Sequence, residues 1–147
     1  MKVLALILAI APTVAQPQTL AEILSAAPEI SYEDWRDMTA GKTVVYQIFG
    51  KTFGFERYQN GNNVTIQLDD GSCIDGTWFM QETAFCFDWE GGPLNCFHHK
   101  RVGDTIYIVG LDNGKESADI QIVSRIDNTP ISCGPALLSA LELGPLP

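Results

Sequence analysis

The feature that most constrains the fold is a series of short segments after Gly41 in which apolar and polar residues alternate. Successive side chains of a strand point to opposite faces of a sheet, so a period of two predicts β-strands. Eight strands are predicted, over residues 43–49, 53–59, 63–69, 73–80, 83–89, 94–101, 105–110 and 119–125. Turn sequences rich in glycine and asparagine separate them, which indicates an antiparallel meander.

The meander predicts the fold class. Its edge strands must be protected from pairing with other chains, so we expect a mostly β domain that closes into a small up-and-down barrel, with a two-sheet β-sandwich as the alternative. Two short helices are predicted before the strands, over residues 20–27 and 31–38. Ser31 is a suitable N-cap for the second helix, Gly41 ends it, and Trp35 is its expected buried anchor.

Turn lengths predict which residues face each other across neighbouring strands. A two-residue turn at Asn60-Gly61 would pair Gln59 with Asn62 and would place Arg57 on the apolar inner face. A two-residue turn at Gly103-Asp104 would place His99 and Arg101 on the same inner face as Phe97.

A two-residue loop at Gln81-Glu82 would set Trp78 opposite Phe85 and Gly76 opposite Phe87. The inner face would then carry four aromatic residues, namely Trp78, Phe85, Phe87 and Trp89.

The first fifteen residues have the pattern of a secretory signal peptide. Lys2 precedes an apolar run over 3–11, and small residues precede the expected cleavage site after Ala15. The run is about half the roughly 20 residues that a transmembrane helix needs. We therefore expect a periplasmic or secreted protein with a signal peptide (1–15), a helical segment (16–41), a barrel domain (42–133) and a C-terminal tail (134–147).

Four cysteines lie after the expected cleavage site, and an oxidising compartment favours their pairing. A three-residue loop at 90–92 sets Cys86 opposite Cys96, although a four-residue loop would undo this pair. Elimination then pairs Cys73 with Cys133. The spacings contain no paired zinc-ligand motif, so we expect no metal site.

The run Cys73-Ile74-Asp75-Gly76-Thr77-Trp78, followed by Phe85-Cys86-Phe87-Asp88-Trp89 and Cys96-Phe97, resembles small exported bacterial proteins with a C-x-x-G-x-W … C-F-x-W … C pattern. The resemblance spans about residues 40 to 110 and implies export and a compact β fold. At the level of the fold there is also a likeness to periplasmic barrels that inhibit hydrolases.

No hydrolase, metalloprotease, P-loop or dinucleotide motif occurs, and the two histidines, His98 and His99, are adjacent. We therefore expect a binding or inhibitory module without a cofactor, and a hydrolase-type enzyme with a site around His99 is the alternative. The candidate ligand-binding residues are Arg57, His99, Arg101, Trp78 and Phe87, and the three basic side chains would hold an anionic group at the barrel mouth.

We expect the protein to bind either another protein, of unknown identity, or a small anionic ligand. The formal net charge of −9 disfavours binding to nucleic acid. We expect a monomer that does not insert into a membrane.

Overall fold

The structure, a computed structural model, describes residues 16–133, so the predicted signal peptide and C-terminal tail lie outside the described residues. Two short helices come first, α1 (Leu20–Ala26) and α2 (Tyr32–Thr39). As predicted, Ser31 caps α2: its hydroxyl accepts a hydrogen bond from the Asp34 backbone N–H at 3.1 Å. Neither helix is long and apolar enough to span a bilayer.

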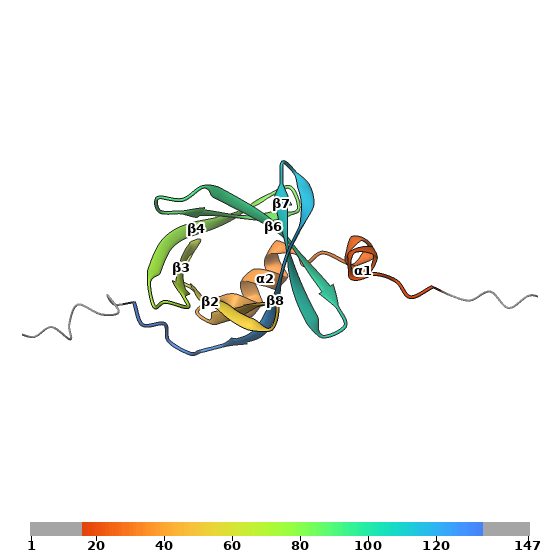
Figure 1. The fold of residues 1–147 in the computed structure, drawn as a ribbon. Coiled ribbons are helices and arrows are strands. Elements are labelled where there is room, and N and C mark those ends of the chain that lie inside the picture. Colours follow the sequence, from red (N-terminus) through yellow and green to blue (C-terminus); the bar gives the residue numbers. More distant parts are fainter. Residues whose placement is uncertain (1–15, 134–147) are drawn as a thin grey trace, which may run out of the picture.

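Eight antiparallel strands follow and close into a barrel in sequence order, with the first strand paired to the last (Figure 1). The mostly β fold class and the closed barrel are therefore confirmed. The strands are β1 (Thr43–Ile48), β2 (Lys51–Tyr58), β3 (Asn63–Leu68), β4 (Cys73–Gln81), β5 (Ala84–Trp89), β6 (Leu94–Val102), β7 (Thr105–Asp112) and β8 (Lys115–Asp127).

The predicted pairing of β2 with β3 is wrong by one residue. Tyr58 pairs with Val64 and Glu56 with Ile66, so the loop at 60–62 holds three residues. A two-residue type I′ turn needs positive φ at both central positions, but in this loop only Gly61 has one, at 73°. A shift of one residue exchanges the two faces of a strand, so Glu56 and Tyr58 face inward and Arg57 faces outward.

The predicted pairing of β4 with β5 is wrong by two residues, because the turn lies at 82–83 and Trp78 pairs with Phe87. A shift of two residues preserves the faces, so the aromatic inner face is confirmed. Gly76 lies opposite Trp89, not opposite Phe87.

The other two predicted registers are correct: Cys86 pairs with Cys96, and His99 pairs with Ile108.

One end of the barrel is filled by α2, which lies within the ring of strands in Figure 1. Trp35 is fully buried there, as predicted, and its ring packs against those of Tyr58 and Phe85. Because α2 leads directly into β1, the turns at 49–50 and 113–114 lie at the opposite end of the barrel, which we call the mouth. The core is therefore concentrated at the α2 end.

Both predicted disulfides are present, Cys86–Cys96 between neighbouring strands and Cys73–Cys133 between β4 and the segment that follows β8. The second bridge joins residues 60 positions apart. It fastens the end of the described chain to the barrel wall.

Candidate functional site

The mouth half of the barrel holds a cavity of about 780 Å³, which we call the lumen cavity. Its walls are mainly apolar, with side chains that include Ile66, Phe87, Phe97 and Ile108. The turn residues Phe49 and Gly50 border it at the mouth. The inner half of the barrel is closed by the aromatic core under α2, so the lumen is filled at one end and open at the other.

Glu56 is the buried acid of the lumen cavity, with 4% of its surface exposed. Its Oε1 accepts a hydrogen bond from the Tyr46 hydroxyl at 3.0 Å, and the Tyr58 hydroxyl lies 3.4 Å from that of Tyr46. Trp35 Nε1 donates to the Tyr58 oxygen at 3.1 Å. A chain of polar groups thus runs from α2 to the carboxyl group.

The environment of Glu56 favours its neutral form. Burial raises its pKa to about 7, against the opposing effect of hydrogen bonds from Tyr58 and Tyr46. An ordinary carboxyl group is fully ionised at neutral pH, whereas this one divides between its two forms. Glu56 can therefore accept a hydrogen bond from a ligand or pair with a ligand charge.

His99, one of the predicted site residues, also lines the lumen cavity and is 1% exposed. Its ring stacks on Phe85 with centroids 4.1 Å apart and meets Trp35 edge-on at 4.3 Å. Within the described residues neither ring nitrogen has a hydrogen-bond partner. Burial, with a smaller effect from His98, lowers the pKa of His99 to about 3, so the imidazole is neutral at physiological pH.

The predicted basic cluster is not formed. Arg57 faces away from the lumen because its strand neighbours Glu56 and Tyr58 face inward. Arg101 shares the face of His99 but lies at the α2 end, where its guanidinium contacts the Met38 sulfur at 3.3 Å. Neither arginine lines the lumen cavity.

The two aromatic candidates occupy different places. Phe87 lines the lumen cavity, as expected of a ligand-binding residue. Trp78 belongs to the closed end, where it packs against Tyr32, Tyr58 and Phe85 and is absent from the cavity wall.

Glu56 was not among the site residues predicted from the sequence. A three-residue reading of Asn60-Gly61-Asn62 would have paired Gln59 with Asn63 and turned Gly54, Glu56 and Tyr58 toward the core. The loop sequence is compatible with both turn lengths and does not decide the register. The signal that could have identified Glu56 is Tyr58, an aromatic residue two positions later and therefore on the same face of the strand. An acid on the same face as a buried aromatic residue is a candidate for a functional group.

A second polar cluster lies on the outer surface, where Glu29, His98 and Glu116 place ligand atoms within 4.8 Å of one another. Lys100 Nζ contacts the same Glu116 oxygen that His98 contacts. Partial burial acts to raise the pKa of Glu116, but hydrogen bonds from Lys100 and His98 and their charges lower it overall. With an ammonium group among its carboxylates, the cluster is an ion-pair network that fastens the Glu29 segment to β6.

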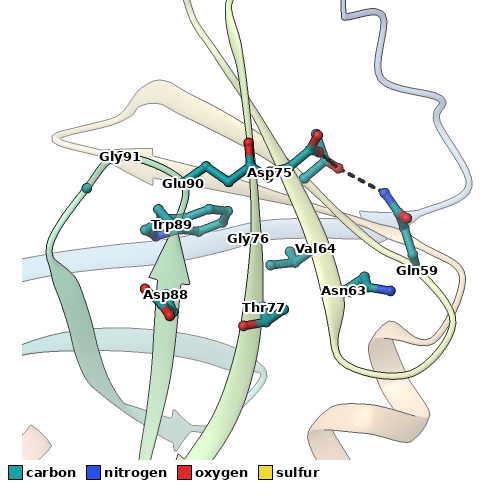
Figure 2. Close-up of a pocket in the computed structure, with 12 residues that line it drawn as sticks. Gln59, Asn63, Val64, Asp75, Gly76, Thr77, Asp88, Trp89, Glu90 and Gly91 are labelled. Atoms are coloured by element: carbon teal, nitrogen blue, oxygen red, sulfur yellow. Dashed lines mark hydrogen bonds between the residues drawn. The ribbon is translucent and has the colours of Figure 1, made fainter.

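A polar groove of about 640 Å³ lies over β3, β4 and β5 (Figure 2). Its acids are Asp75, Asp88 and Glu90, and all three are solvent-exposed. Thr65 links Gln59 to Asp75 by hydrogen bonds. Exposed carboxylates are satisfied by water, so the lumen cavity, with its buried polar groups, is the stronger candidate site.

Comparison of the chain with known protein families, with curated protein sequences and with solved structures found no match. The fold alone does not determine a function, because barrels of this kind serve many activities. The lumen cavity and the residues that line it are therefore the features from which a function can be inferred.

Proposed function

We propose that the protein is a binding protein that holds a small, mainly apolar molecule in the lumen cavity. The observation that carries this proposal is a cavity of about 780 Å³ whose apolar walls surround two buried polar side chains, Glu56 and His99. Ligand sites typically measure about 300–1,000 Å³ and combine apolar walls with a few polar groups. The cavity has both properties.

We propose that binding takes place outside the cytoplasm. The predicted signal peptide supports export, and the two disulfides are compatible with an oxidising compartment. Intact-mass analysis of protein recovered outside the cytoplasm would test this: export predicts a chain that begins at Gln16, and a retained Met1 would contradict it.

The hydrolase alternative receives little support from His99. A catalytic imidazole is normally oriented by a second polar group and lies within reach of a nucleophile. His99 instead stacks on Phe85, and no described side chain bonds to its nitrogens. The anionic-ligand hypothesis also loses support, because Arg57 and Arg101 lie outside the cavity wall.

The binding proposal is tested with N-phenyl-1-naphthylamine, a neutral dye whose fluorescence rises in apolar sites. We expect saturable fluorescence with the wild-type protein. The Leu68→Trp variant should lose most of it, because Leu68 lines the lumen cavity and a larger ring would fill that space. The Leu94→Trp variant is the matched control, because Leu94 is an exposed residue that does not line the cavity.

Near-ultraviolet circular dichroism would establish that both variants are folded. Absence of saturable dye binding to the wild-type protein, or equal binding by the two folded variants, would refute a lumen site.

A further inference from the structure

The charged side chains that line the lumen cavity are all acidic. They are Glu56 in the interior and Asp112 and Asp119 on β7 and β8. No lysine or arginine occurs in the lining within the described part of the chain. An anionic ligand would therefore enter without a cationic partner, whereas a cation would meet complementary charge.

The buried polar groups of the cavity provide hydrogen-bond acceptors. Glu56 already accepts from Tyr46, but a carboxylate has about four acceptor positions, so it can accept further bonds. A neutral imidazole keeps one nitrogen as an acceptor, and both nitrogens of His99 lack a partner among the described residues. A protonated primary amine carries three donors and no acceptor, which matches this set.

Among the residues that the structure describes, no positively charged side chain is paired with Glu56. A buried carboxylate is stable in its ionised form only when it is paired with a positive charge. The titratable groups that face it are the hydroxyls of Tyr46 on β1 and Tyr58 on β2, with His99 on β6 in the same cavity. None of them is positively charged at neutral pH, so a ligand ammonium would supply the missing charge.

We propose that the lumen cavity selects small amphipathic amines, with the ammonium group held by Glu56 and His99 and the apolar body lying along Phe87 and Phe97. This inference rests on the proposed binding function and names its ligand class. The interior position of Glu56 directs the amine toward the closed end of the barrel and leaves the apolar body near the mouth.

The test compares three ligands that share one apolar body: 4-phenylbutylamine, 4-phenylbutan-1-ol and 4-phenylbutyrate. Calorimetry at pH 7.5 is expected to rank them amine, alcohol, acid in order of decreasing affinity. The amine should bind at least about tenfold more tightly than the alcohol, as expected for a charge-assisted hydrogen bond.

Two variants assign the preference to Glu56. Glu56→Gln should remove the advantage of the amine over the alcohol, because the amide keeps the size of the side chain but carries no charge to pair with the ammonium group. Asp88→Asn removes an equal charge from an exposed position on the outer groove and should change neither affinity.

The outcomes separate the two proposals. Equal binding of amine and alcohol, or an amine preference that survives in Glu56→Gln, would overturn the amine inference and leave the binding function intact. Tightest binding of 4-phenylbutyrate would overturn it in favour of an anionic ligand. Failure of all three ligands and of the dye would overturn both proposals.

Discussion

Glu56 is a buried acid that accepts a hydrogen bond from the Tyr46 hydroxyl and shares the lumen cavity with the neutral histidine His99. A buried position of this kind lowers the free energy of unfolding at neutral pH, because the carboxyl group ionises less readily in the folded protein than in the unfolded chain. Proteins retain costly polar groups of this kind most often at functional sites. The residue therefore links the stability of the barrel to the chemistry of its cavity.

The raised pKa of Glu56 predicts a stability that falls as pH rises. Between pH 4.5, its ordinary pKa, and about 7, the folded protein holds a proton that the unfolded chain has lost. Glu56→Gln removes this ionisation. At pH 8 the variant should be more stable than wild type by about 3 kcal/mol, and the difference should vanish below pH 4.5.

Urea unfolding across this pH range measures the effect. The exposed residue Glu90 provides a control for the loss of one carboxyl group, because surface substitutions such as Glu90→Gln usually change the stability by less than about 0.5 kcal/mol. Parallel stability curves for Glu56→Gln and wild type would show that Glu56 is normally ionised in the folded protein.

At the scale of the elements, the close pairing of β4 with β5 depends on Gly76. Trp89 lies across Gly76 in Figure 2, and a Cβ atom at position 76 would come within 2.7 Å of both the Trp89 ring and the Asp88 carbonyl oxygen. Alanine therefore requires the backbone of one strand to move. The glycine of the C-x-x-G-x-W motif is therefore explained by the close approach of Trp89 and Asp88 to position 76.

We expect Gly76→Ala to destabilise the protein by about 1–3 kcal/mol, as overpacked sites do. Gly92→Ala is the matched control, since its added Cβ would lie 3.5 Å from the nearest atom, an ordinary contact. Thermal unfolding followed by circular dichroism compares them. A Gly76→Ala variant as stable as Gly92→Ala would show that the two strands have room to separate.

The hairpins also show what the sequence could predict about the elements. The turn at 103–104 offered one register, whereas the loop after Trp89 could hold three or four residues. The three-residue loop at 90–92 was predicted, and both registers agree with the structure. Asn60-Gly61-Asn62 was compatible with two loop lengths, and the choice depended on the backbone angle of Asn60, which composition does not determine. That one residue decided whether Arg57 or Glu56 faced the lumen.

At the scale of the whole molecule, the barrel and both disulfides followed from strand period, turn positions and the number of cysteines. The half-open lumen could not be predicted in this way, because it depends on where α2 packs. The pattern of a helix indicates which of its faces is apolar, but it does not identify the surface against which that face packs. Trp35 was predicted to be buried, but its position within the barrel comes from the tertiary structure.

The two disulfides should contribute unequally to global stability. Cys73–Cys133 closes a loop between residues 60 apart, and Cys86–Cys96 a loop between residues 10 apart. The entropy that each bridge removes from the unfolded chain corresponds to a stabilisation of about 4 kcal/mol for Cys73–Cys133 and about 3 kcal/mol for Cys86–Cys96. Cys73→Ser/Cys133→Ser should therefore unfold at lower urea concentration than Cys86→Ser/Cys96→Ser. The reverse order would show that strain or packing, and not loop length, decides the contribution.

The helix that fills one end of the barrel also bears on kinetics. Because α2 and its aromatic partners close that end, a molecule in the lumen enters and leaves through the mouth. The water that it displaces leaves through the mouth as well. An amine that binds at Glu56 would enter with its ammonium group first, pass the apolar walls, and lose its hydration water before it reaches the carboxylate. Such a route slows entry and exit together, so residence time can be long at modest affinity.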